Sequence, residues 1–154
     1  EEITYAQISK MEYLNAFVKE ALRYRGPTIG VFNRVAMKDE TLGDLKIKKG
    51  FTFNIGVPVI SVNPKYYKDP EVFRPERWIE KTDPGVCDPA VFLPFSGGGR
   101  RCIGEQLALI EAKIMLCELL RNTKIAIKEP YDLKMTFGVA YHAKDPIHAI
   151  YRKI

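Results

Sequence analysis

The chain has 154 residues, the length of one domain, and its 46% hydrophobic and 28% charged residues are ordinary for a globular protein. The net charge of +5 at pH 7 comes from scattered lysines and arginines, which excludes the basic run typical of nucleic-acid-binding proteins. No apolar stretch approaches the length of a membrane span, and the first residues do not have the organisation of a signal peptide.

Apolar residues at helical spacing predict a first long helix over residues 11–25. Ser9 and Glu12 have the spacing of a capping box at its start, and Gly26-Pro27 ends it. Turn signals then separate three expected strands, over residues 31–37, 45–48 and 51–55.

Most of the ten prolines lie between residues 58 and 94, so only two short helices (59–62 and 70–73) and a long irregular meander are expected there. A second long helix is expected over residues 104–121, and its apolar positions predict a buried set: Leu107, Ile110, Ile114, Leu116 and Cys117. Strands over residues 124–127, 133–141 and 147–151 then complete an α+β, mostly helical chain with two long helices and small β-sheets.

The segment from Phe95 to Gly104 is the most informative part of the chain, because its glycines surround Cys102. Three features favour the thiolate form of this cysteine. The glycines let backbone amides approach the sulfur, the following helix presents its positive end, and Arg100 and Arg101 add charge. A thiolate at such a junction is either a metal ligand or a nucleophile.

The other two cysteines, Cys87 and Cys117, do not share these features. The chain has no CxxC pair and no histidine at zinc-ligand spacing. An odd number of cysteines without a pattern indicates a reducing compartment rather than a disulfide framework. Cys117 is expected to be a small core residue.

Glu20 and Arg23 are three residues apart on the first helix, so their side chains are neighbours on one face. One interpretation is a solvated surface ion pair. The alternative is a buried pair that Arg77 completes, since the rigid, aromatic segment from Phe73 to Trp78 can bring a second arginine onto the carboxylate.

Three motifs stand in the chain in this order: Glu20-x-x-Arg23, Phe73-x-Pro75-x-Arg77, and Phe95-x-x-Gly98-x-Arg100-x-Cys102-x-Gly104, with Ala108 six residues after the cysteine. Their order and spacing resemble the cytochrome P450 family of haem-thiolate monooxygenases. The resemblance implies that residues 1–154 are the C-terminal, haem-ligating part of a single domain, without the oxygen-side helix and the N-terminal part. It implies an enzyme that this chain is too incomplete to form alone.

The resemblance implies haem b (iron protoporphyrin IX) as cofactor and Cys102 as its metal ligand, with no catalytic side chain in this part. The thiolate charge would push electron density onto the iron and favour O–O cleavage. Arg100 would pair with a haem propionate, as would Arg34, whose alternative interpretation is an exposed strand arginine. The implied cofactor-binding residues are Phe95, Gly98, Arg100, Cys102 and Gly104 in the ligand loop, and Arg34.

Glu20, Arg23 and Arg77 would form a structural network behind the ligand loop. Residues 28–32 and 140–142 occupy positions that touch substrate in the family, or are plain loops.

The chain also departs from the family pattern. Ser61 stands where many relatives have a histidine that contacts a propionate, so this contact is expected to be weaker or missing. Trp78 stands directly after Arg77, where the family more usually has phenylalanine, and its size is expected to be tolerated there. His142 and His148 are not placed to bind iron. The chain also has no Gly-x-x-Thr stretch of the kind expected for the family's oxygen-side helix.

The implied reaction inserts one oxygen atom from O₂ into an apolar organic substrate, with electrons from a reductase or a ferredoxin. Arg100, Arg101 and Lys113 form a plausible docking surface for an acidic donor, or are ordinary solvated charges. No nucleic-acid partner is expected. The segment 94–98 is similar to that of microsomal members, which implies the endoplasmic reticulum membrane, reached through sequence outside this chain. A mitochondrial location is the alternative.

Two alternatives to a monooxygenase are also compatible with the sequence. The chain is then either a non-catalytic haem-binding or interaction module, or a decayed fragment without activity. A hydrolase with a cysteine nucleophile needs a general base, and neither histidine is placed to serve as one.

Overall fold

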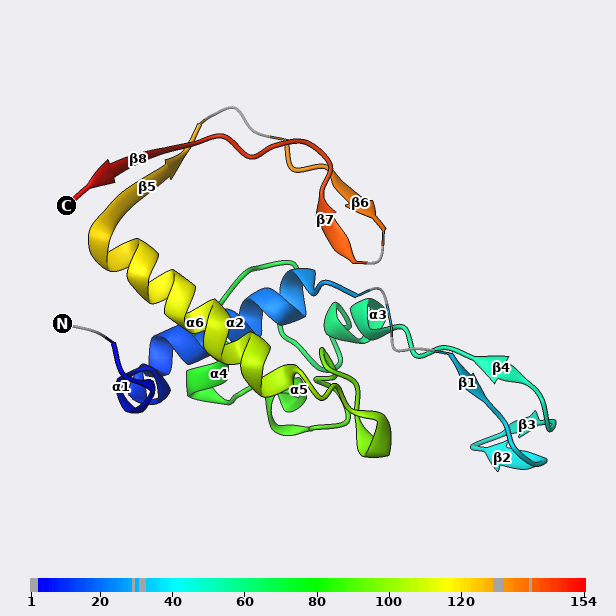
Figure 1. The fold of residues 1–154 in the computed structure, drawn as a ribbon. Helices are drawn as coiled ribbons and strands as arrows, with labels where there is room; N and C mark the ends of the chain where they lie inside the picture. Colours follow the sequence, from blue (N-terminus) through cyan, green and yellow to red (C-terminus); the bar gives the residue numbers. More distant parts are fainter. Residues whose placement is uncertain (1–2, 29, 31–32, 129–131, 139) are drawn as a thin grey trace.

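The computed structural model describes residues 3–28, 30, 33–128, 132–138 and 140–154. Its helices are α1 (Tyr5–Lys10), α2 (Glu12–Arg25), α3 (Val57–Ser61), α4 (Arg77–Glu80), α5 (Pro84–Cys87), the 3₁₀ helix η1 (Gly98–Arg100) and α6 (Glu105–Asn122). Its strands are β1 (Arg34–Val35), β2 (Glu40–Leu42), β3 (Leu45–Ile47), β4 (Thr52–Phe53), β5 (Thr123–Ile127), β6 (Met135–Phe137), β7 (Tyr141–Ala143) and β8 (Ala149–Lys153). Figure 1 shows α2 and α6 crossing at the centre of the helical part.

The N-terminus contains a short helix that the sequence interpretation did not include. Thr4 and Gln7 form the capping box of α1, with the Gln7 N–H 3.3 Å from Thr4 Oγ1 and the Thr4 N–H 2.8 Å from Gln7 Oε1. The predicted box at Ser9 and Glu12 is wrong, because Ser9 lies inside α1 and donates its hydroxyl to the Ala6 carbonyl. A serine at the end of a helix satisfies its hydroxyl by bonding back to the preceding turn.

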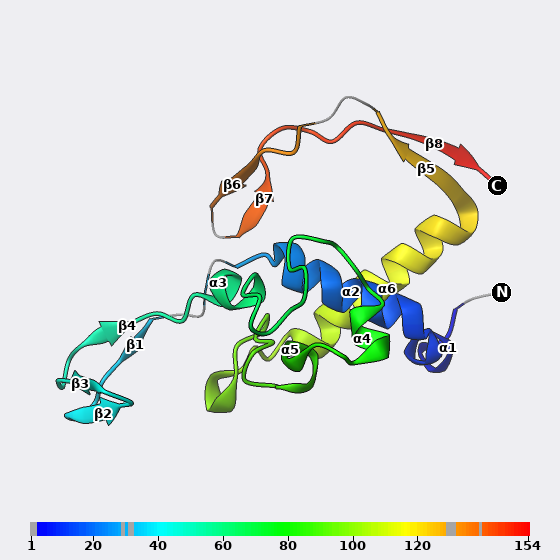
Figure 2. The same ribbon diagram turned by 180° about the vertical axis from the view of Figure 1, so that it is seen from behind.

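The strands form four two-stranded antiparallel sheets among the described residues: β1 with β4, β2 with β3, β5 with β8, and β6 with β7. The predicted single strand over residues 133–141 is wrong, since β6 and β7 are the two arms of a hairpin. In both views, β1 to β4 extend away from the helices, and β5 to β8 arch over α2 (Figures 1 and 2).

The proline-rich middle of the chain folds around Tyr67, which is completely buried. The short helix expected near residue 60 is confirmed as α3, whereas the helix expected over residues 70–73 is a turn. The Tyr67 hydroxyl donates to the Gly85 carbonyl at 3.2 Å, and burial raises the pKa of this tyrosine to about 12. A Cβ on Gly85 would lie 2.6 Å from Tyr67 Cζ, so only glycine permits this approach.

A small core lies between α2 and this middle segment. It consists of Ala16, Tyr67, Trp78 and Val91, with half-buried residues such as Phe92 packed around them. The Trp78 and Phe92 rings pack at an interplanar angle of 56°, with centroids 4.5 Å apart. The core therefore fixes the start of the segment that leads to Cys102.

Helix α6 confirms the second long helix, but the expected burial of its apolar face is wrong. None of its side chains is fully buried in the described part of the chain, and Leu107 is 61% exposed. Periodicity identifies an apolar face without indicating what packs on it, and the described helices and strands that contact α6 include α1, α2 and β5. Within the described ranges, no helix has the length and apolar character needed to cross a membrane.

Candidate functional site

The cysteine loop is a tight turn that joins η1 to α6. Ser96 and Gly98 both have left-handed backbone, with φ of 64° and 68°. The Cys102 N–H donates to the Phe95 carbonyl at 2.9 Å and closes the loop. Gly104 is the N-cap residue of α6, so Cys102 lies two residues before the positive end of an 18-residue helix.

The Cys102 thiol is free and exposed. A Cβ added to Gly104 would lie 3.8 Å from Cys102 Sγ, in ordinary contact, so the glycine leaves the sulfur uncovered on that side. An exposed sulfur is a soft donor of the kind that binds transition metals. Cys102 would therefore be able to hold an iron-bearing group such as haem.

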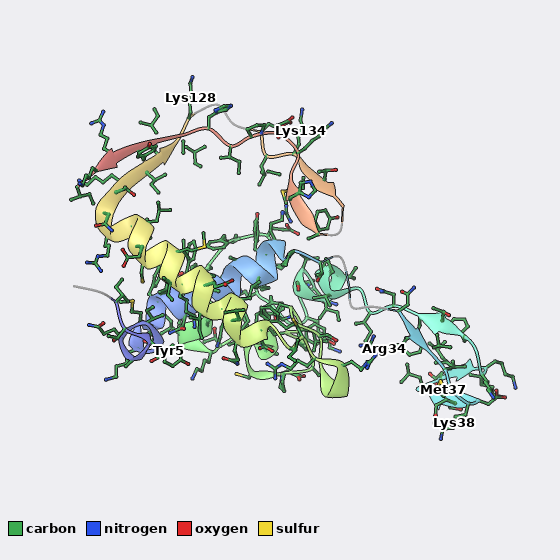
Figure 3. All side chains as sticks on the ribbon, in the orientation of Figure 1. Tyr5, Arg34, Met37, Lys38, Lys128 and Lys134 are labelled. Atoms are coloured by element: carbon green, nitrogen blue, oxygen red, sulfur yellow. The ribbon has the colours of Figure 1, made fainter. Side chains whose placement is uncertain are left out.

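Three other predicted cofactor residues lie before η1, at its end and in β1. Phe95 is half-buried and lines a cavity of about 460 Å³ together with Trp78 and residues of α2 and α6. Arg100 is exposed at the end of η1. Arg34 is half-buried in β1, where the β-hairpins leave the helical part (Figure 3).

The basic residues of the predicted docking surface differ in their partners. Arg101 forms an ion pair with Glu105, whose hydrogen bonding and charge raise the pKa of the arginine. Lys113 lines the same cavity as Lys19, and its pKa is lowered by burial and then by the charge of that lysine. The sequence interpretation missed Lys19, which lies on α2 and joins this surface only through the α2–α6 packing.

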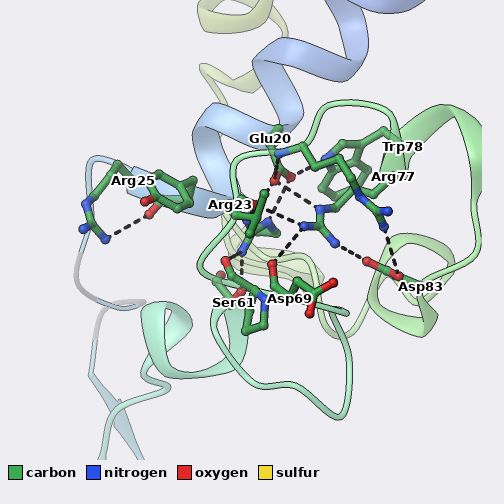
Figure 4. A network of polar contacts seen from close by, with 12 residues as sticks. Glu20, Arg23, Arg25, Ser61, Asp69, Arg77, Trp78 and Asp83 are labelled. Carbon is green, nitrogen blue, oxygen red and sulfur yellow. Dashed lines mark hydrogen bonds and ion pairs between the residues drawn. The ribbon is translucent and has the colours of Figure 1, made fainter.

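The predicted network of Glu20, Arg23 and Arg77 is confirmed, and it is buried (Figure 4). All three side chains are 0% exposed. Arg23 donates through Nε and Nη2 to the two Glu20 oxygens at 2.9 and 2.8 Å, a bidentate arrangement. Arg77 Nε adds a third bond to Glu20 at 3.1 Å. The surface ion-pair interpretation is therefore wrong.

The two arginines also bind backbone carbonyls of the middle segment. Arg23 Nη1 donates to the carbonyls of Ser61 and Pro70 at 2.8 and 2.9 Å, and Arg77 Nη1 donates to that of Lys68 at 2.9 Å. Ser61 thus contributes its backbone carbonyl, as an acceptor for Arg23, rather than its side chain. Each arginine thus donates to several backbone carbonyls between Ser61 and Val72 and holds this stretch against α2 and α4.

Three contributors to the network were missed from the sequence. Trp78 Nε1 and the Arg74 backbone N–H each donate to Glu20 at 2.9 Å, and Asp83 forms an ion pair with Arg77. Burial alone would raise the pKa of the Glu20 carboxyl, but hydrogen bonds from Arg23, Arg74 and Trp78 lower it. The ionised Glu20 carboxylate therefore stabilises the fold at pH values above its ordinary pKa. This stabilisation is lost as the pH falls through the lowered pKa of the folded state.

We expect Trp78→Phe to lower the free energy of unfolding by about 1.5–3 kcal/mol, the usual contribution of a hydrogen bond to a charged group. Phenylalanine keeps an aromatic ring beside Phe92 but removes the indole donor to Glu20. Urea unfolding followed by far-ultraviolet circular dichroism measures the loss, with Phe92→Leu as a comparison that removes the ring beside Trp78 but keeps the donor to Glu20. A change below about 0.5 kcal/mol, typical of neutral substitutions, would mean that the indole donor contributes little to stability.

The two segments predicted to touch substrate meet at the end of α2. The Tyr141 N–H donates to the Pro27 carbonyl at 2.8 Å, and Thr28 and Tyr141 line a second cavity of about 330 Å³. Residues 29, 31 and 32 of the first segment lie outside the described residues. Both histidines are exposed: His142 lies in β7, and His148 immediately precedes β8.

Comparison with known proteins accounts for this combination of a cysteine loop and a buried ion network. The sequence model of the family Cytochrome P450 matches residues 1–147. Cytochrome P450 4e2 of Drosophila melanogaster is 41% identical over 125 residues, which cover 80% of this chain and 23% of that protein. Cytochrome P450 4e5, mitochondrial, of Drosophila mettleri is 36% identical over 124 residues, 80% of this chain and 23% of that protein.

The fold agrees with the sequence comparison. The structure of retinoic acid-bound cyanobacterial CYP120A1 is similar over 100% of this chain and 36% of that chain, with a TM-score of 0.92 and 25% identity. The chain thus spans about a quarter of the length of the two Drosophila relatives. Since the family match covers nearly the whole chain, the chain belongs to the cytochrome P450 family.

Proposed function

We propose that residues 1–154 are the C-terminal, proximal part of a single cytochrome P450 domain whose other elements, including an oxygen-side helix, come from sequence outside this chain. The proposal is supported by the share of the relatives that the chain covers, 23% of the Drosophila melanogaster protein and 36% of the cyanobacterial structure. It is also supported by the exposed apolar residues of α6, which have the character of a packing face.

The proposed role of the chain is to hold haem b through the Cys102 thiolate. The observation that carries this proposal is the exposed thiol on a loop that the Cys102–Phe95 hydrogen bond closes ahead of α6. Phe95 begins the loop, and Gly98 and Gly104, which have no side chains, would leave room for haem beside the sulfur. Arg100 and Arg34 are proposed to bind the haem propionates, and Ser61 offers no imidazole for this task.

The proposed activity is monooxygenation of an apolar organic substrate, since haem, when bound to a thiolate, supplies the chemistry that activates O₂. In this activity the chain would provide the anionic sulfur ligand, Phe95 would shield it once haem is bound, and the Glu20 network would hold the middle segment in place. Thr28 and the hairpin at Tyr141 are proposed to border the substrate. The retinoic acid bound in the cyanobacterial relative is an example of an apolar ligand.

Electrons are proposed to come from a reductase or a ferredoxin that docks on the surface formed by Arg100, Arg101, Lys113 and Lys19. Because Glu105 pairs with Arg101, the lysines carry most of the uncompensated charge there. The proposed location is the endoplasmic reticulum membrane, with the mitochondrion as the alternative in view of the name of the Drosophila mettleri relative.

The test is the carbon monoxide spectrum of the complete polypeptide that contains this chain, purified and reduced. We expect the long-wavelength band of a thiolate-ligated ferrous haem, and product formation with a reductase, O₂ and an apolar substrate. A short-wavelength, histidine-type band or an absence of haem would refute the ligand assignment. A thiolate band without product from a broad set of apolar substrates would favour the second candidate, a non-catalytic haem-binding module.

A further inference from the structure

Asp83 is a buried carboxylate, 3% exposed, on the side of Arg77 opposite Glu20 (Figure 4). Arg77 donates through Nε to Glu20 at 3.1 Å and through Nη1 to Asp83. The Arg77 guanidinium therefore lies between two carboxylates, one from α2 and one from the start of α5.

The position of Asp83 in the chain does not explain its burial. Asp83 is the N-cap residue of α5, where an aspartate ordinarily accepts a hydrogen bond from the first turn of the helix. Its side chain makes no capping bond. The carboxylate instead faces Arg77 and lies 3.8 Å from Nη2 of the half-exposed Arg74.

The charges of the network require such a group. Glu20, Arg23 and Arg77 are fully buried, and together they carry one uncompensated positive charge. A buried charge without a partner is strongly destabilising. Asp83 brings the buried set to two carboxylates and two guanidinium groups, which is neutral.

The segment that follows Asp83 leads to the cysteine loop. Its first turn is fixed by the hydrogen bond from the Gly85 N–H to the Tyr66 carbonyl at 2.9 Å and by the bond from Tyr67 to Gly85. The segment then continues to Cys102 through Phe92, whose ring packs against Trp78, and Phe95, which lines the same cavity. Asp83 is thus the point where this segment is attached to the buried network.

We propose that Asp83 is a positioning residue: the fourth, charge-balancing member of the buried network, which holds the segment from Asp83 to Cys102 in place for haem. This inference rests on the proposed function, because the segment ends at the ligand loop. It extends the role of the network from supporting the middle segment to orienting the cysteine.

The experiment uses the complete polypeptide with Asp83→Asn, which keeps the shape and an acceptor oxygen but removes the charge. We expect haem bound per polypeptide to fall by about tenfold, because Arg77 loses its balancing charge. We also expect a larger fraction of the remaining haem to lack the thiolate-type carbon monoxide band. Asp88→Asn is the matched control: it is an exposed aspartate in the same segment, and its Oδ1 accepts from the Ala90 N–H. Equal haem content and spectra in the two variants would overturn the proposal.

A second pair of variants covers the case in which Asp83→Asn fails to accumulate. Asp83→Glu and Asp83→Gln have the same size and differ in charge, so more haem and more thiolate band in the glutamate variant support the proposal. Equal behaviour of these two variants overturns it. A double-mutant cycle with Arg77→Gln should show coupling in urea unfolding, and strictly additive effects would count against the pair. If wild type itself lacks the thiolate band, the proposed function fails, while this cycle still tests the bond between Asp83 and Arg77.

Discussion

Replacing Cys102 with serine is expected to remove the long-wavelength carbon monoxide band from the reduced protein. The band depends on an anionic sulfur ligand, and a serine hydroxyl at neutral pH is neither anionic nor soft. The loop itself is expected to survive, because the closing hydrogen bond to the Phe95 carbonyl uses the backbone N–H of residue 102. The measurement is the reduced carbon monoxide difference spectrum of the complete polypeptide, with total haem determined separately.

The remaining cysteines provide matched controls for this substitution. Cys87 is exposed and its sulfur lies near the Lys81 carbonyl, and Cys117 Sγ lies 3.5 Å from Met11 Sδ on the far part of α6. Cys87→Ser and Cys117→Ser should leave the band unchanged. Cys102→His should keep haem but show a histidine-type spectrum, since a neutral imidazole pushes less electron density. If Cys102→Ser keeps the thiolate-type band, the loop is not the ligand loop.

Replacing Arg23 with alanine is expected to abolish haem incorporation, although Arg23 lies in the network rather than in the ligand loop. The substitution leaves Glu20 buried without its bidentate partner, and breaking a buried ion pair costs about 3–5 kcal/mol. It also frees the carbonyls of Ser61 and Pro70 that Arg23 binds. Haem absorbance per polypeptide, together with urea unfolding, measures both consequences.

Arg25 is the matched control, because it lies two residues later on the same helix but is exposed. Arg25→Ala should change the free energy of unfolding by no more than about 0.5 kcal/mol. Arg34→Ala should cost less haem than Arg23→Ala, because a propionate has other cationic partners. Normal haem content in Arg23→Ala would show that the bonds of Arg23 to Glu20 and to the middle segment are dispensable.

Several features could be predicted from the sequence because they depend on local spacing. The three-residue separation of Glu20 and Arg23 places them on one helical face in any fold, and the run of glycines around Cys102 ends at a helix start. The two long helices were likewise predictable from apolar periodicity. The capping box at Ser9 failed for a local reason as well, since Thr4 and Gln7 offer a competing box a few residues earlier.

The tertiary structure decided which partners these residues meet. No spacing rule connects Trp78 Nε1 or Asp83 to the pair on α2, because Trp78 follows Glu20 by 58 residues and the strands, α3 and turns between them take a path set by packing. Lys19 and Lys113 face one cavity only because α2 crosses α6. Helical periodicity predicted an apolar face on α6 but not its exposure, because burial depends on the elements that pack against the helix.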